Sequence, residues 1–214
     1  MACHAGGYLQ TVRVLGVKSI SRSTVTVRVG DETATFKDGE EVRFAANAGA
    51  PRALTLDRVE FLGYEDGELE DSRDLRRDVT RQIRLWRPDL IISQSPRRIY
   101  SNFPGWHRDH RITGSVVLDC VYPLARDHLA FPELFPEYEP HQVREVYLIQ
   151  WEQPSLLVDI TDTMDVKLKS IACHASQVGD LKAVEARMRR RAAILGKTNG
   201  QMYAEGFDHV LLPG

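Results

Sequence analysis

The sequence is poor in cysteine, has no excess of charge of one sign and contains no long apolar run. Its cysteines, Cys3, Cys120 and Cys173, form no CxxC pair, which argues against a disulfide framework and favours a reducing, cytoplasmic compartment. The formal net charge is −2, so no concentrated positive field indicates a nucleic acid partner. No apolar run approaches the roughly 20 residues that cross a bilayer, and the amino terminus lacks the apolar core of a secretory signal. We therefore expect a soluble protein with no membrane partner.

Hydrophobic residues are plentiful, at 43% of the 214 positions, which is enough for one sizeable core. The pattern changes near residues 45–53. Before that point, valines at positions 25, 27 and 29 alternate with polar residues, and glycine turns separate the short apolar stretches that follow up to Phe44. This pattern predicts a small antiparallel meander. We therefore divide the chain into an atypical β-rich amino-terminal segment, residues 1–55, and an α/β domain, residues 56–214.

After residue 55, short apolar runs alternate with segments of helical period, which predicts an α/β layer fold with a largely parallel sheet. Ser72 is expected to cap a helix that must end before Pro88. Strands are predicted at 59–62, 89–92, 146–149 and 156–160, and helices at 72–86, 112–124, 161–174 and 180–195.

The residues most informative for function follow the strand predicted at 89–92. They read Gly105-Trp106-His107-Arg108-Asp109-His110, and ligand sites in open α/β sheets form outside the carboxyl ends of strands. A neutral imidazole can bind zinc, a second one can donate a hydrogen bond or a proton, and a nearby carboxylate can fix a ring's tautomer. His107 and His110 could divide those roles, with Asp109 as the orienting group. The alternative is that this polar loop only caps the following helix.

Several landmarks along the chain together resemble a known family. They are the turn Leu62-Gly63-Tyr64-Glu65-Asp66-Gly67-Glu68-Leu69, the pair Arg76-Arg77, the strand Arg87-Pro88-Asp89-Leu90-Ile91-Ile92, the loop His107-Arg108-Asp109-His110 and the late motif His174-Ala175-Ser176-Gln177. In this order and spacing, the chain resembles the PIG-L/LmbE-like N-acetylglucosaminyl deacetylases over about residues 56–207. The resemblance implies a Rossmann-like three-layer fold, here preceded by the predicted meander.

The resemblance also implies an activity: a zinc-dependent hydrolase that removes an N-acetyl or similar acyl group from an amino-sugar conjugate. It implies that His110 binds the metal ion, and that His107 polarises the scissile carbonyl or protonates the leaving amine with support from Asp109. The partner would be an amino sugar or glycoconjugate, and a homo-oligomer is compatible with this reading.

The resemblance places three further residues at the substrate pocket, namely Asp66, His174 and Gln177. For Asp66, a simple turn-forming Asp-Gly pair is at least an equal explanation.

One family motif has no counterpart in residues 1–58. The family opens with an AHPDD-like motif that supplies a histidine and an aspartate to zinc and a further aspartate as general base. The nearest phrase here, Ala2-Cys3-His4-Ala5-Gly6-Gly7, has no acidic pair. A catalytic zinc normally needs about three protein ligands and an open position for water. Two functions therefore stay open: a metal-dependent deacetylase, and an inactive relative that binds a ligand or partner without turnover.

Overall fold

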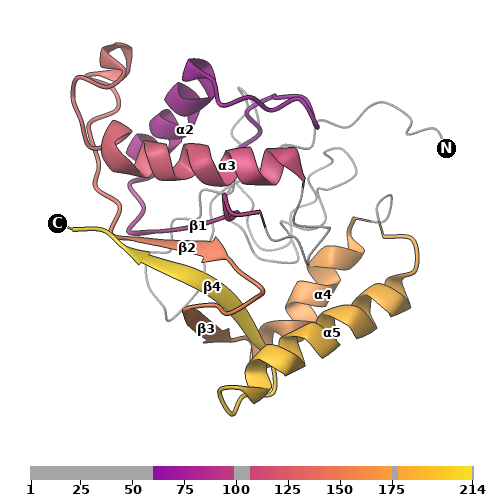
Figure 1. Cartoon of the computed structure of the whole chain (residues 1–214). Helices are drawn as coiled ribbons and strands as arrows, with labels where there is room; N and C mark the ends of the chain where they lie inside the picture. Colours follow the sequence, from indigo (N-terminus) through magenta and orange to yellow (C-terminus); the bar gives the residue numbers. More distant parts are fainter. Residues whose placement is uncertain (1–59, 99–106, 175–177, 214) are drawn as a thin grey trace, which may run out of the picture. The chain divides into compact units, whose positions relative to one another are not determined.

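A computed structural model describes residues 60–98, 107–174 and 178–213 of the chain (Figure 1). The described residues belong to two compact units. The first contains residues 61–98, 107–149 and 209–213, and the second contains residue 60 and residues 150–174 and 178–208. The meander predicted at 25–44 and the rest of segment 1–55 lie outside the described residues.

The first unit is built from two helices and the first two strands. Its elements are α2 (Arg73–Trp86), β1 (Leu90–Ser93), α3 (Arg108–Asp119), a π-helical segment (Cys120–Leu124), a 3-10 turn (Pro132–Leu134) and β2 (Glu145–Ile149). Figure 1 shows α2 and α3 side by side, with α3 over β1. Strands β1 and β2 are parallel, with Leu90 opposite Glu145.

Helix α2 confirms the prediction made from its capping residue and apolar spacing. The Ser72 hydroxyl accepts a hydrogen bond from the Leu75 amide at 3.2 Å, which satisfies one of the amides that a helix leaves unpaired at its start. Leu75, Val79 and Ile83 are fully buried in the core of the unit. The helix ends at Arg87, whose φ of 49° turns the chain out of the helix before the buried Pro88.

Two predicted boundaries in the first unit differ from the structure. The strand predicted at 59–62 does not form over the described residues 60–62; Leu62 packs on the core without joining the sheet. The helix predicted at 112–124 already starts at Arg108, and its last turn is π-helical around Pro123. Because proline has no amide hydrogen and its ring crowds the preceding turn, the regular helix does not continue through it.

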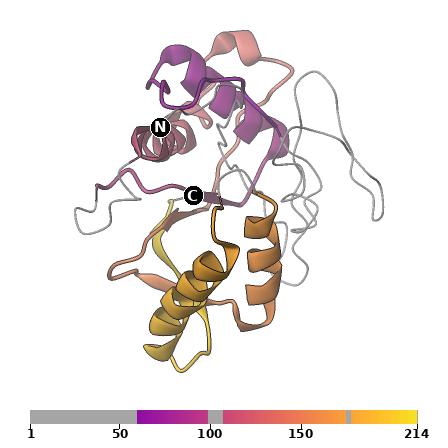
Figure 2. The ribbon, with the colours of Figure 1, turned by 90° about the vertical axis from the view of Figure 1, so that its right-hand side faces the viewer.

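The second unit contains β3 (Leu156–Asp159), a 3-10 turn (Thr161–Thr163), α4 (Met164–Ala172), α5 (Leu181–Lys197) and most of β4 (Ala204–Leu211). Helices α4 and α5 lie side by side (Figures 1 and 2). Their contact is centred on the buried side chains of Ile160, Met164, Leu168 and Ala192. None of the helices in the described residues combines the length and apolar character that a bilayer crossing requires.

The four strands form one open sheet in the order β1-β2-β4-β3, so the chain has a mixed α/β fold. Strands β3 and β4 are antiparallel, with Leu156 opposite Phe207. Helices α4 and α5 lie between these two strands in the chain. The predicted largely parallel sheet is therefore not confirmed. Strand β4 was not predicted from the sequence.

A buried cation from α2 holds an irregular segment of the first unit. The Arg84 side chain is only 2% exposed and donates hydrogen bonds to the carbonyl oxygens of Leu124, Ala125, Asp127 and Ala130 at 3.0, 3.3, 2.7 and 2.9 Å. Burial lowers the pKa of Arg84. The carbonyl dipoles around the guanidinium offset part of the cost of burying its charge.

Helix α3 packs tightly against the chain that leaves β1. A Cβ atom added at Gly114 would lie 2.5 Å from the carbonyl oxygen of Gln94 and 2.7 Å from the nitrogen of Pro96. Both atoms belong to the backbone and have little room to move. Only glycine therefore permits this approach, which sets the distance between α3 and the carboxyl end of β1.

We predict that Gly114→Ala destabilises the first unit. Overpacking against a backbone costs about 1–3 kcal/mol, which exceeds the at most ~1 kcal/mol that alanine gains over glycine inside a helix. Urea unfolding of the variant beside the wild type measures the difference, with Ser115→Ala on the same helix as the control. Equal stability of Gly114→Ala and the control would contradict this account of the contact.

Candidate active site

The first part of the site is the turn at 65–68, which presents Asp66 to solvent. The Glu68 amide donates to the Glu65 carbonyl at 3.3 Å, and Gly67 has a φ of 86°. A positive φ at the third position is typical of turns that favour glycine there. The Asp66-Gly67 pair thus forms a turn, as the simpler interpretation of this sequence predicted, and it also places the Asp66 carboxylate beside His107.

The second part is the start of α3, where His107 is the capping residue. Its Nδ1 atom accepts a hydrogen bond from the Asp109 amide at 3.3 Å. A nitrogen that accepts carries no proton, so the neutral ring has its proton on Nε2. That atom lies 3.9 Å from Oδ1 of Asp66, which is too far for a hydrogen bond. His107 therefore turns a proton-bearing nitrogen toward the Asp66 carboxylate.

The turn and the helix start together form a small polar cluster. Asp66, His107 and Asp109 each offer a ligand atom, and these atoms lie within 4.8 Å of one another. The side chains of Asp66 and His107 are 54% and 43% exposed. The ring centre of His110 lies 5.0 Å from that of His107, so a second imidazole lies beside the cluster.

Asp109 is the buried member of this cluster, at 5% exposure. Its Oδ2 atom accepts a hydrogen bond from the Gly67 amide at 2.6 Å, and its Oδ1 atom is buried without a hydrogen-bond partner among the described residues. The helix start favours negative charge at this position. Asp109 thus contacts His107 through its main-chain amide, whereas its carboxylate binds the Gly67 amide of the turn.

The cluster has the donors that a divalent ion needs. Carboxylate oxygens and imidazole nitrogens are usual zinc ligands, and a buried carboxylate oxygen without a partner lowers its free energy by meeting a cation. The unpartnered Oδ1 atom of Asp109 therefore fits a bound ion. The cluster forms entirely within the first unit.

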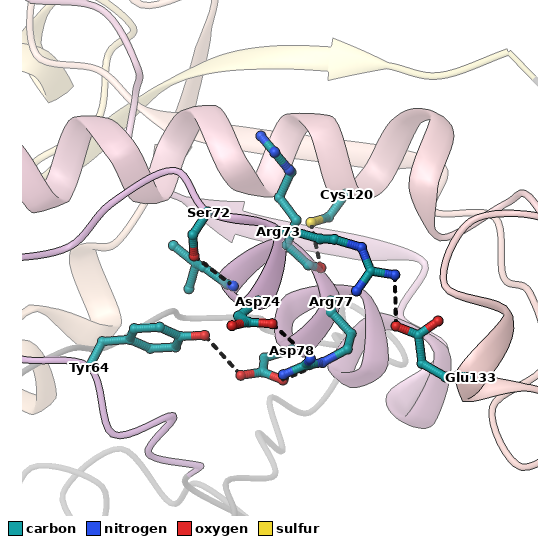
Figure 3. A network of polar contacts seen from close by, with 10 residues as sticks. Tyr64, Ser72, Arg73, Asp74, Arg77, Asp78, Cys120 and Glu133 are labelled. Carbon is teal, nitrogen blue, oxygen red and sulfur yellow. Dashed lines mark hydrogen bonds and ion pairs between the residues drawn. The ribbon is translucent and has the colours of Figure 1, made fainter.

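A second set of contacts fixes the segment that carries Asp66. Figure 3 shows the Tyr64 hydroxyl directed toward Asp78 on α2, to which it donates at 2.9 Å. Arg77 also binds Asp78, at 3.2 Å, and Asp74, at 2.8 Å. Burial, followed by the hydrogen bond to Asp78, raises the pKa of the Tyr64 phenol well above its usual value. The segment before the turn is thus tied to α2.

Sequence reasoning assigned two further site residues, His174 and Gln177. His174 lies directly after α4 in the second unit, where its amide donates to the Ile171 carbonyl at 3.0 Å. Gln177 lies outside the described residues. Their role in substrate binding stays a prediction, whereas Asp66, His107, Asp109 and His110 do come together.

Two features of the site were not anticipated from the sequence. The first is the Gly67 amide as the partner of Asp109, for which the only signal was a glycine in a polar turn. The second is the Tyr64–Asp78 contact, which joins residues 14 positions apart and has no sequence signal. Both involve side chains whose partners are set by the fold and not by local spacing.

Comparisons with known proteins show the family of this chain. The PIG-L family profile, described as GlcNAc-PI de-N-acetylase, matches residues 4–121. A diacetylchitobiose deacetylase from Thermococcus kodakarensis is 30% identical over 183 residues, which cover 85% of this chain and 65% of that protein. The chain belongs to the PIG-L family and is related to deacetylases.

Two solved structures support the same relationship. The N,N'-diacetylchitobiose deacetylase from Pyrococcus horikoshii, solved with its inhibitor MPG, has a TM-score of 0.68 and 31% identity, covering 76% of this chain and 60% of that one. The conserved protein TT1542 from Thermus thermophilus has a TM-score of 0.65 and 27% identity, covering 78% and 72%. The chain thus spans just under two thirds of the length of its curated deacetylase relative.

The family match also shows where along the chain the similarity to the family begins. The resemblance seen in the sequence began at about residue 56, whereas the profile match begins at residue 4 and so includes most of segment 1–55. The proposed division of the chain at residue 55 stays a prediction.

We predict that Tyr64→Phe lowers stability by about 0.5–1.5 kcal/mol at neutral pH, the usual net worth of one hydrogen bond. The effect should shrink at alkaline pH. A phenol ionises near pH 10 in the unfolded chain, while the folded pKa of Tyr64 is higher. Above about pH 10 the wild type therefore loses a contribution to stability that the variant never had. Urea unfolding of both proteins at about pH 8 and pH 10.5 tests this; a constant difference would contradict it.

Proposed function

We propose that this chain is a metal-dependent deacetylase that acts on an N-acetylated amino sugar or its conjugate. The observation that carries the proposal is the meeting of Asp66, His107 and Asp109 within 4.8 Å, beside His110, in a member of the PIG-L family. The turn and the helix start supply these groups from positions about 40 residues apart. Such a cluster of imidazoles and carboxylates suits hydrolysis of an amide better than ligand binding alone.

The ion would be held by His110, as the family resemblance implies, together with carboxylate oxygens of Asp66 and Asp109. The Oδ1 atom of Asp109 supports this assignment because it is buried and has no hydrogen-bond partner in the part of the chain that the structure describes. When bound, a zinc ion supplies an acidified water molecule and polarises the acyl oxygen.

His107 is better suited to proton transfer than to ligation. Ligation through Nε2 would require the proton to move to Nδ1, and the capping bond from the Asp109 amide to Nδ1 would be lost. As the ring stands, its Nε2–H can donate to the acyl oxygen as negative charge develops there, or to the departing amine. We therefore assign proton donation to His107.

The reaction consumes one water molecule. Its oxygen forms a bond to the acyl carbon, the carbon–nitrogen bond of the amide breaks, and the nitrogen leaves with a proton as a free amine. The products are acetate and the deacetylated sugar. In this scheme Asp66 is the exposed carboxylate at the mouth of the cluster, and it would also contact substrate hydroxyl groups. His174 and Gln177 are proposed substrate contacts from the later motif.

Chitobiose derivatives are the first substrates to test. The Thermococcus and Pyrococcus relatives are named for N,N'-diacetylchitobiose, and this chain shares about 30% of their residues over the matched regions. We propose an N-acetylglucosamine unit at the cluster, with its acetamido group facing His107.

We predict about one tightly bound zinc ion per chain after loading and removal of loosely bound ions. His110→Ala should lose most of this zinc because it removes a proposed ligand, while His107→Ala should keep it. Elemental analysis of the purified proteins measures the stoichiometry, with the exposed His128→Ala as the matched control. Absence of zinc from the wild type would instead support an inactive relative that binds a ligand or partner.

We predict that zinc-loaded wild type releases acetate from N,N'-diacetylchitobiose and that His107→Ala lowers kcat by roughly 10²–10⁴-fold, the usual worth of a positioned proton donor. Enzymatic detection of acetate, paired with detection of the new amine, measures the rate. An unchanged rate in His107→Ala with full zinc content would contradict the role given to His107.

A further inference from the structure

The carboxylate of Asp109 has a contact that neither metal binding nor orientation of His107 requires. Its Oδ2 atom accepts the Gly67 amide hydrogen at 2.6 Å, although the two residues are 42 positions apart in sequence. The amide belongs to the turn that carries Asp66. One oxygen of a buried side chain on α3 thus holds a surface turn.

Within the described residues, the turn has little support from outside, apart from its own hydrogen bond between the Glu68 amide and the Glu65 carbonyl. Asp66, Gly67 and Glu68 are all exposed, and no described residue outside the turn lies within 4 Å of the position that a Gly67 Cβ atom would take. On either side the chain is fixed: Tyr64 binds Asp78, and the Leu69 carbonyl accepts a hydrogen bond from Arg108. Between these anchors, the bond to Asp109 is the contact that fixes the middle of the turn.

By fixing the turn, this bond also fixes the position of Asp66 beside His107. Asp66 precedes Gly67, and its Oδ1 atom lies 3.9 Å from Nε2 of His107. His107 itself is held by the main-chain amide of Asp109. Asp109 therefore fixes both partners, His107 through its main chain and the turn through its side chain.

We propose that Asp109 is a positioning residue whose carboxylate clamps the Gly67 amide and so places Asp66 opposite His107. The inference deepens the proposed deacetylase function and rests on it only for its effect on the rate; the clamp itself is a property of the fold. The bond needs an acceptor oxygen and not a charge. An amide side chain of the same shape should therefore preserve the clamp, whereas a methyl group should abolish it.

The test of the clamp is amide hydrogen exchange at Gly67, followed by NMR in the full-length protein. We expect Asp109→Ala to speed exchange at Gly67 by about tenfold or more, since an exposed turn amide keeps little protection without its hydrogen bond. Asp109→Asn should keep most of the protection. Asp119→Ala, an exposed aspartate at the end of the same helix, serves as the control. Unchanged exchange at Gly67 in Asp109→Ala would overturn the proposal whether or not the protein is active.

A double-mutant cycle tests the effect on Asp66. If Asp109 acts on the rate partly by placing Asp66, the losses in acetate release caused by Asp66→Ala and Asp109→Ala will not multiply in the double variant. We also expect Asp109→Asn to be faster than Asp109→Ala at saturating zinc. Fully multiplicative losses would overturn the positioning role while leaving the deacetylase function intact. If the wild type releases no acetate, the proposed function fails, and exchange at Gly67 still decides the clamp.

Discussion

The close approach of α3 to the chain leaving β1 is the constraint on which the rest of the first unit depends. A glycine at position 114 lets the helix backbone come within van der Waals distance of Gln94 and Pro96. Because α3 is a rigid element that starts at Arg108, fixing its middle also fixes its first turn. That first turn holds every group of the α3 part of the site. The positions of the site residues on α3 therefore depend on packing about two helical turns away.

The polar groups of the site differ in their exposure to solvent. Asp66 and His107 are about half exposed, so they can meet a substrate and exchange protons with water. Asp109 is buried and serves as the fixed member against which the others are placed. Burying one carboxylate is tolerated because the start of a helix and an amide hydrogen stabilise its charge. The arrangement resembles other preorganised sites, in which inner groups hold the geometry and outer groups react.

The sequence was sufficient for elements whose signals are local and insufficient for those decided by distant contacts. Helix α2 follows from Ser72 and the spacing of Leu75, Val79 and Ile83, and β1 follows from its apolar run. Strand β4 was missed because its residues, Ala204–Leu211, mix glycine and charged side chains, and it forms only by pairing in the sheet. The HxDH loop was singled out from its own residues, but the contact of Asp109 with Gly67 depends on a turn 42 residues away.

The hydrogen bonds from Arg84 to main-chain carbonyl oxygens affect which residues of this segment can vary among relatives. Main-chain oxygens are present whatever side chains a segment carries, so the hold of Arg84 on residues 124–130 does not depend on the side chains of that segment. Substitutions along that stretch can accumulate while its path is preserved. Loss of this one arginine would remove four hydrogen bonds to the stretch at once. In a comparison of relatives, an arginine at this position would identify the same backbone path even where the sequences of the segment share nothing.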